Sequence, residues 1–187
     1  MLIVLYGPSC VGKSTIQNVL CRHFGWRPIR CFTTRKPRHN DISRIHVSPA
    51  EFQCMSDQNA FFLENVQFGE MYGTSKVDIA FALRSEDLFF VLDFRINDRL
   101  QLSPVRHCKI LVSVDGSEDL MKRIALANRR DRQEEILSEY RRNYTAENLH
   151  SLRAEGFAVV NNPFGALDVA VKNVLALTDG RNKTYQE

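Results

Sequence analysis

Four short apolar runs recur along the chain, and segments with helical periodicity separate them. The runs lie at residues 2–6, 89–94, 110–114 and 157–161. Apolar runs without polar alternation are typical of strands buried on both faces, as in parallel sheets. Strands that alternate with helices in this way predict an α/β sandwich with a mostly parallel central sheet.

Several helix boundaries are marked by capping residues. Ser48 is followed by a proline and then by Glu51 three residues on, which is the pattern of a capping box with proline at the first helical position. Ser75 and Ser117 offer similar N-caps. The apolar spacing near the end of the chain predicts a last helix over about 164–177.

Two regions depart from the alternation. Residues 33–73 contain no long apolar strand but many polar, aromatic and basic residues, with short extended pieces at 44–47 and 61–66. We expect an inserted subdomain there. Residues 122–148 are helical in pattern and rich in arginine, with a break at 129–132, which is typical of a mobile lid.

The whole chain is expected to form one domain. A length of 187 residues is enough to bury a full hydrophobic core. The insert at about 33–73 and the lid at about 122–148 would interrupt a core made of residues 1–32, 74–121 and 149–180.

The strongest signal for function follows the first apolar run. Residues 7–14, Gly-Pro-Ser-Cys-Val-Gly-Lys-Ser, fit the pattern G-x-x-x-x-G-K-[ST] of a phosphate-binding loop. The glycines let backbone N–H groups point inward, Lys13 supplies a cation for the outer phosphates, and the Ser14 hydroxyl can ligate Mg²⁺. ATP and Mg²⁺ are therefore the expected ligands. The residues expected to contact the nucleotide are Gly7, Ser9, Cys10, Val11, Gly12, Lys13, Ser14 and Thr15. A degenerate loop that has lost its activity is the alternative.

The charge distribution also favours a polyanionic ligand. The net charge is only +3, but residues 22–38 carry six Lys or Arg residues and residues 122–142 carry seven. Solvated helix faces are the plainer explanation for part of these side chains. The basic residues do not form one continuous stripe with stacking aromatics, so we expect no nucleic-acid partner.

Cysteine usage and hydropathy bear on the compartment. The chain has five cysteines, an odd number, with no Cys-x-x-Cys spacing, which argues against a disulfide framework and a zinc site. No apolar stretch approaches the ~20 residues of a membrane-spanning helix. We expect a cytoplasmic protein without membrane partners, either a monomer or a homodimer.

A second motif, Thr33-Thr34-Arg35-Lys36-Pro37-Arg38, places two arginines where they can grip one phosphate from two sides. Together with the phosphate loop and several weaker motifs, it resembles the guanylate kinase family of nucleoside monophosphate kinases. The weaker motifs are Phe62–Glu64, Tyr72–Ser75, Leu92-Asp93 and Val159–Asn162.

The resemblance implies roles on the acceptor side. Arg35, Arg38 and Tyr72 would bind the phosphate of the acceptor monophosphate, and Glu64 would accept hydrogen bonds from the amino edge of a guanine. Thr74 would also contact the acceptor.

It also implies roles on the donor side. Lys13 would neutralise the β- and γ-phosphates of ATP, and Asp93 would help Ser14 to position the metal or would contact the acceptor. Asn161 would lie near the adenine. Lid arginines would close over the transferring group, and the candidates are Arg129 or Arg130 together with Arg141.

The chain departs from the family at three acceptor positions. Arg44 stands in place of a tyrosine, Arg95 in place of the second carboxylate of an Asp-x-Asp pair, and Cys31 where a base-contacting serine is common. The two arginines would pair with Asp41 or Glu64, or they would meet extra negative charge on the substrate.

A fourth departure concerns the donor side. Cys10 occupies a loop position where the family often has glycine. A thiol at a helix N-terminus is expected to have a lowered pKa and to be sensitive to oxidation.

These features predict ATP-dependent phosphoryl transfer to a small-molecule acceptor, a nucleoside monophosphate, with GMP or dGMP as the first choice. One alternative is a kinase for ribose 1,5-bisphosphate, because some relatives of this fold act on it. The other is a non-catalytic binding module of the same family.

Overall fold

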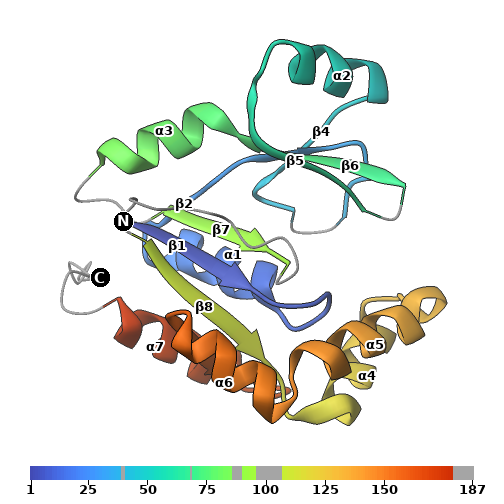
Figure 1. Ribbon diagram of the computed structural model, residues 1–187, viewed down its shortest axis with the longest axis vertical. Helices are drawn as coiled ribbons and strands as arrows, with labels where there is room; N and C mark the ends of the chain where they lie inside the picture. Colours follow the sequence, from blue (N-terminus) through green and yellow to red (C-terminus); the bar gives the residue numbers. More distant parts are fainter. Residues whose placement is uncertain (39–40, 68, 86–89, 96–106, 179–187) are drawn as a thin grey trace.

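The computed structural model describes residues 1–38, 41–67, 69–85, 90–95 and 107–178, which form two sheets and the helices around them (Figure 1). The central sheet has the strand order β2-β7-β1-β8-β9, and all of its strand pairs are parallel. This confirms the predicted fold class. Its strands are β1 (Leu2–Tyr6), β2 (Arg27–Pro28), β7 (Phe90–Phe94), β8 (His107–Ser113) and β9 (Phe157–Asn161).

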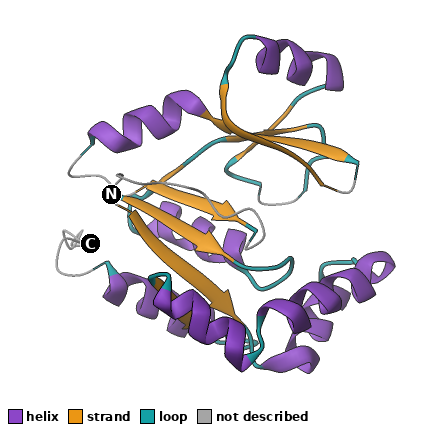
Figure 2. Ribbon diagram, viewed as in Figure 1, coloured by secondary structure: helices purple, strands orange, loops and turns teal. Residues whose placement is uncertain are grey.

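Both faces of the central sheet are covered, because successive side chains of a strand point to opposite sides. In β1, Ile3 and Leu5 pack into one buried cluster, and Leu2, Val4 and Tyr6 pack into another. The first cluster joins the sheet to α1 (Lys13–His23), α4 (Gly116–Leu126), α5 (Gln133–Asn143) and α7 (Leu167–Leu177). The second joins it to α3 (Lys76–Arg84) and α6 (Ala146–Ala154). Helices therefore flank the sheet on both sides (Figure 2).

The second sheet is built from the predicted insert and lies above the carboxyl ends of the central strands in Figure 1. Its order is β4-β3-β6-β5, in which β3 and β4 are parallel and the other pairs are antiparallel. The strands are β3 (Cys31–Thr33), β4 (Arg44–His46), β5 (Phe61–Gln67) and β6 (Glu70–Ser75), and α2 (Pro49–Asp57) crosses between β4 and β5.

Two of the three predicted caps are present. Ser48 and Glu51 form the full capping box at α2, and the Ser75 hydroxyl accepts a hydrogen bond from the Asp78 N–H at α3. The prediction for Ser117 was wrong, because α4 begins at Gly116 and the Asp119 carboxylate instead accepts from the Asp115 N–H.

The last helix also starts later than predicted. It begins at Leu167, because Gly165 has a φ of 79° and the chain turns there, with the Ala166 N–H donating to the Pro163 carbonyl. Positive φ is incompatible with a helix.

The arginine-rich region contains two helices joined by a short 3₁₀ turn. Helix α4 ends at Leu126, the turn η2 spans Arg130–Arg132, and α5 follows directly. Thr145 then caps α6 by accepting from the Asn148 N–H. Within the described part of the chain, no helix has the length and apolar character needed to cross a bilayer.

Candidate active site

The phosphate loop connects β1 to α1 at the carboxyl edge of the central sheet, where open α/β sheets place their ligands. Gly12 has a φ of 94°, and a Cβ there would lie 2.3 Å from the Asn162 amide nitrogen, so only glycine fits. The Asn162 amide donates to the Val11 carbonyl at 2.8 Å. Lys13 is buried and donates to the carbonyls of Gly7 at 2.9 Å and Pro8 at 2.8 Å. The loop is thus held in shape by contacts on both sides.

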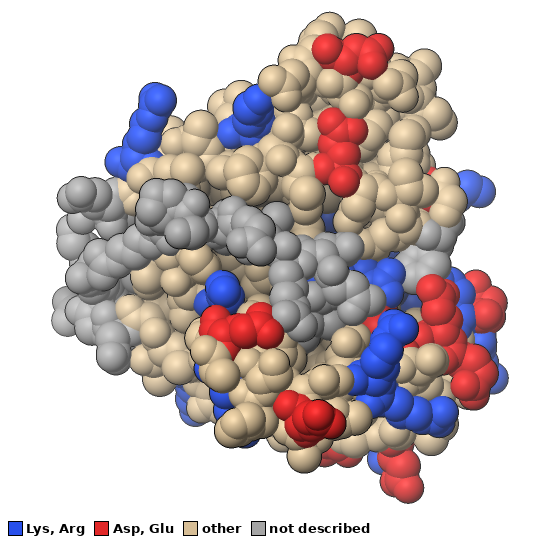
Figure 3. Space-filling view, viewed as in Figure 1, with Lys and Arg blue, Asp and Glu red and all other residues tan. Residues whose placement is uncertain are grey.

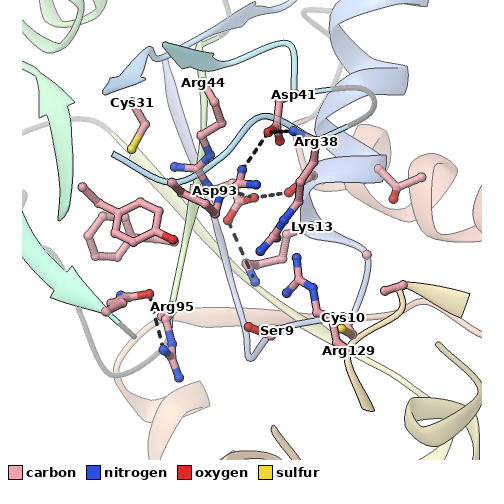
Figure 4. A pocket seen from close by; sticks show the side chains of 18 of the residues that line it. Ser9, Cys10, Lys13, Cys31, Arg38, Asp41, Arg44, Asp93, Arg95 and Arg129 are labelled. Carbon is pink, nitrogen blue, oxygen red and sulfur yellow. Dashed lines mark hydrogen bonds and ion pairs between the residues drawn. The ribbon is translucent and has the colours of Figure 1, made fainter. Parts of the chain in front are cut away.

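Asp93 lies at the centre of the cluster of charges beside this loop (Figure 4). Its carboxylate accepts a short hydrogen bond from the Ser14 hydroxyl and lies 3.9 Å from the Lys13 ammonium and 3.6 Å from the Arg44 guanidinium. The register of β1 with β7 explains this, because Asp93 pairs with Leu5 two residues before the loop.

The charges on Asp93 and Lys13 depend on one another. Burial is the largest single influence and would raise the pKa of Asp93, but Lys13, Arg44, the Ser14 hydrogen bond and Arg35 together outweigh it, and the pKa lies below its ordinary value. Burial lowers the pKa of Lys13, although Asp93 and Glu139 oppose this shift. Anionic phosphates would stabilise the charged lysine.

A magnesium ion fits the oxygen atoms gathered here. The Ser14 hydroxyl and the Asp93 carboxylate already contact each other, and Mg²⁺ is commonly bound by one or two protein carboxylates together with substrate phosphates. Among the described residues, no three His, Cys, Asp or Glu side chains gather into a metal site. Phosphate oxygens would therefore have to supply a large share of the ligands.

Across the cavity, Arg35 and Arg38 follow β3. The Arg35 guanidinium pairs with Asp41 at 2.7 Å, and the same carboxylate accepts from the Arg38 N–H at 3.0 Å. The His46 ring is also 2.6 Å from the Arg35 carbonyl. Both arginine side chains line the cavity, so the predicted phosphate grip is held in place by Asp41.

The face of the small sheet that lines the cavity is defined by its strand register. Four paired residues, one from each strand, lie side by side across β4, β3, β6 and β5, so their side chains share one face: Arg44, Cys31, Thr74 and Leu63. The next row is His46, Thr33, Tyr72 and Asn65. The lining residues among these are Arg44, Cys31, Thr74, Leu63, Tyr72 and Asn65.

Glu64 lies on the opposite face of this sheet, so the structure does not bring it to the cavity where we predicted its contact with a guanine. It pairs with Gly73, its side chain is exposed, and it accepts from the Ser56 hydroxyl at 2.8 Å. Strand alternation instead turns Leu63, Asn65 and Gln67 toward the cavity.

From the arginine-rich segment 122–148, Arg123, Arg129 and Arg132 line the cavity. The candidates Arg130 and Arg141 are exposed and are not among the lining residues, because the η2 turn and the exposed side of α5 direct them elsewhere.

Asn161 also lies outside the lining. Its amide donates a short hydrogen bond to the Asp115 carboxylate, and it does not line the cavity where we expected the adenine.

The expectation of an acidic Cys10 was also wrong. Burial raises the pKa of the Cys10 thiol, and the opposing effect of Arg129 and Lys13 is smaller. The thiol is therefore favoured over the thiolate.

These residues line one cavity of about 800 Å³ that is strongly basic. Of the described residues that line it, eight are Lys or Arg and only two, Asp41 and Asp93, are acidic. On the face shown in Figure 3, basic and acidic side chains lie intermixed over α4 and α5. The surplus of positive charge is thus concentrated inside the cavity, as a polyanionic ligand requires.

Sequence reasoning missed several lining residues, among them Leu63, Asn65, Gln67, Arg123 and Arg132. The period-two alternation of β5 could have identified the first three once the strand's inward face was known. Arg123 carried no local signal, because its role depends on the loop after β9: its guanidinium donates to the Asn162 carbonyl at 2.6 Å.

Comparison with known proteins agrees with this arrangement. The sequence model of the guanylate kinase family matches residues 1–176. Guanylate kinase from Helicobacter pylori (strain ATCC 700392 / 26695) is 30% identical over 134 residues, which cover 67% of this chain and 63% of that protein. Guanylate kinase from Bartonella quintana is 26% identical over 187 residues, which cover 97% of this chain and 83% of the relative.

A solved structure extends the similarity to the fold. The crystal structure of guanylate kinase from Anaplasma phagocytophilum superposes with a TM-score of 0.65 at 14% identity, covering 99% of this chain and 87% of the other. The fold, the phosphate loop and the match over nearly the whole sequence lead to one conclusion. The chain belongs to the guanylate kinase family.

Proposed function

We propose that the protein transfers the γ-phosphoryl group of ATP to a nucleoside monophosphate, with GMP and dGMP as the first acceptors to test. One observation supports this most directly: the loop residues Lys13 and Ser14 and the arginine grip Arg35 and Arg38 line the same cavity, with Asp93 between them. Phosphoryl transfer mainly requires that two anions be held in line while their charge is neutralised.

The residues divide this work by position. Lys13 would bind the outer phosphates of ATP, while Ser14 and Asp93 would hold Mg²⁺, which when bound neutralises charge on the phosphates. Arg35 and Arg38 would bind the acceptor phosphate, with Tyr72 beside them. We assign the lid contribution to Arg129 and Arg132, because they line the cavity.

Arg44 also belongs to the acceptor side. It lies 6.0 Å from the centre of the Tyr72 ring and 3.6 Å from Asp93. Because Asp93 also contacts Lys13 and Ser14, it neutralises the Arg44 guanidinium only in part. A phosphate bound beside Tyr72 would complete the neutralisation of Arg44. This favours Arg44 as a third phosphate ligand in place of the family's tyrosine.

The surplus of arginine keeps ribose 1,5-bisphosphate as a second candidate acceptor. The charges are partly met within the protein, however, because Arg95 pairs with Glu139 and Arg44 lies near Asp93. A nucleoside monophosphate is therefore the better fit. A non-catalytic module would not need the buried Lys13 or its neighbours Ser14 and Asp93.

The test is to follow the label from [γ-³²P]ATP after incubation with Mg²⁺ and GMP. Label in GDP is the expected result, and it distinguishes transfer from hydrolysis, which would release labelled phosphate. A calorimetric titration with ATP would accompany it. If ATP fails to bind, the binding-module alternative is favoured and the proposal is wrong.

A further inference from the structure

One histidine lies against the phosphate grip of Arg35 and Arg38. His46 is the last residue of β4. Its Nδ1 lies 2.6 Å from the Arg35 carbonyl oxygen, and its Nε2 lies 3.4 Å from the Asp41 carboxylate. The ring therefore contacts both the backbone of Arg35 and the acid that pairs with its guanidinium.

The two ring nitrogens of His46 have different partners. A carbonyl oxygen can only accept, so the contact with the Arg35 carbonyl requires a proton on Nδ1. Nε2 is buried and forms no hydrogen bond within the described residues, although it faces the Asp41 carboxylate. In a neutral ring, Nε2 would turn its lone pair toward that carboxylate. A second proton, on Nε2, would convert the contact into an ion pair.

Asp41 is the acid that these groups share. Its Oδ2 atom accepts from the Arg35 guanidinium at 2.7 Å and from the Arg38 N–H at 3.0 Å, and it is the same atom that His46 faces. Another nitrogen of the Arg35 guanidinium donates to the Lys36 carbonyl at 3.1 Å. Two donor nitrogens of Arg35 are thus engaged within the protein.

A phosphate bound to Arg35 would change these contacts. Guanidinium groups bind phosphate best through two parallel N–H···O bonds, so Arg35 would give up part of its pairing with Asp41. The Asp41 side chain is only 18% exposed, and a largely buried carboxylate without a partner is unfavourable. His46 already lies where a replacement partner is needed, and an imidazole can gain its second proton within the physiological pH range.

The other groups on this face make the proton depend on the phosphate. Tyr72 on β6 shares the face, because it and His46 pair with the same residue of β3. Burial raises the pKa of the Tyr72 hydroxyl, so it stays neutral. Arg44, two residues before His46 on β4, lies on the same face. Without an anion, Arg35, Arg38 and Arg44 oppose another positive charge, whereas a bound phosphate offsets them.

We propose that His46 is a positioning residue for the acceptor phosphate. When the phosphate binds Arg35, Asp41 shifts its pairing to the His46 ring, which takes a proton from solvent at Nε2. The ring does not touch the substrate; it stabilises the carboxylate that Arg35 leaves. This inference rests on the proposed function and adds a regulation to it: acceptor binding takes up a proton and weakens as the pH rises.

Titration calorimetry of the full chain measures this coupling without turnover. The probe is GMP, or the nucleoside monophosphate that the transfer assay favours. Binding heats in two buffers of different ionisation enthalpy give the number of protons taken up. We expect about half a proton or more for the wild type at about pH 7.5, where an imidazole is ordinarily neutral. The ligand phosphate has a second pKa of about 6, and comparison between variants removes its contribution.

Two substitutions of His46 separate its functions. His46→Asn places an amide nitrogen near Nδ1, so the donor to the Arg35 carbonyl is kept. His46→Gln places an amide nitrogen near Nε2, as a permanent donor toward Asp41. Neither amide titrates, so both variants should take up less than the wild type by about half a proton. The second variant keeps the test decisive if the first does not fold.

A matched control is His150→Asn, which changes an exposed histidine on α6. Its proton uptake should equal that of the wild type. Urea midpoints verify the folding of each variant.

The pH dependence of acceptor binding gives a second readout. The complex holds more protons than the separate partners, so the acceptor Kd rises with pH. Half a proton corresponds to about threefold in Kd per pH unit between about pH 7 and pH 8. This dependence should be flatter in both His46 variants and unchanged in His150→Asn.

Each outcome has a defined meaning. Uptake by the wild type that is no greater than in the folded His46 variants would overturn the role of His46 and leave the proposed function intact. An equal loss of uptake in His150→Asn would overturn it as well. If no nucleoside monophosphate binds at all, both the proposed function and this inference are wrong.

Discussion

At the scale of single residues, the site concentrates charges that would be unfavourable alone. Lys13 is only 7% exposed, and the Asp93 side chain only 10%. An isolated buried charge is strongly destabilising, whereas a pair with further hydrogen bonds is tolerated. Ser14 and Arg44 supply those additional contacts to Asp93. Under the proposed function, the cluster would exchange these internal contacts for phosphates and a metal.

Lys13→Ala is the simplest test of the phosphate loop. It removes the only cation of the loop, which would face charge developing on the transferring group, so we expect kcat to fall by at least about 100-fold. Steady-state kinetics with the wild type's favoured acceptor measures the loss. Circular dichroism and a thermal melt serve as controls for folding. Retention of near-normal kcat in a folded variant would contradict the assigned role.

Asp93 makes stability depend on pH in the acid range. Its pKa in the folded protein lies below the ordinary value of 3.8, because the raising effect of burial is outweighed by the combined effect of Lys13, Arg44, the Ser14 hydrogen bond and Arg35. The unfolded chain therefore takes up the proton first as the pH falls. The carboxylate's contribution is present above the unfolded pKa and is lost as the pH drops through the folded pKa.

Asp93→Asn removes this contribution. We expect the wild type to lose unfolding free energy more steeply than the variant between about pH 5 and pH 3. Urea titrations at several pH values measure both slopes. Parallel slopes would show that Asp93 is not held ionised by its neighbours.

At the scale of elements, Arg95 connects three parts of the molecule. It follows β7 in the core, donates to Glu139 on α5, and donates to Gln67 on β5 of the small sheet. The Glu139 side chain is only 4% exposed. Removing its partner would leave a buried carboxylate near Lys13, where it would compete with phosphates for the lysine.

Arg95→Met is thus expected to cost about 2 kcal/mol of unfolding free energy, a figure discounted because Arg95 is partly exposed. The double variant Arg95→Met with Glu139→Gln should recover most of the loss, since no unpaired charge then remains. Denaturant unfolding of the four proteins gives the coupling. Simple additivity would mean that the two side chains act independently.

Some secondary-structure elements could be predicted from the sequence pattern and others could not. Strands β1 and β9 have the bounds that their apolar runs predicted, and the caps at Ser48 and Ser75 are present, because both signals are local. The inward face of β5 was not predictable. It depends on pairing with β6 and on an irregularity between Phe61 and Leu63, so the motif alone could not show that Glu64 faces away from the cavity.

At the scale of the whole molecule, the cavity lies between three bodies that are far apart in sequence. The loop after β1, the small sheet and the arginine-rich helices each supply lining residues. The motifs located the loop and the grip of Arg35 and Arg38. They could not select Arg129 and Arg132 among the lid arginines, because the η2 turn decides which side chains face inward.

The central claim is phosphoryl transfer from ATP to a nucleoside monophosphate. The most direct measurement is a coupled assay of ADP release with ATP and Mg²⁺ against GMP, dGMP, IMP, AMP, CMP, UMP, dTMP and ribose 1,5-bisphosphate, run beside Lys13→Ala. We expect release that requires a nucleoside monophosphate, with GMP or dGMP preferred, and that is lost in the variant. Release with ribose 1,5-bisphosphate alone, or with no acceptor in the panel, would contradict the account.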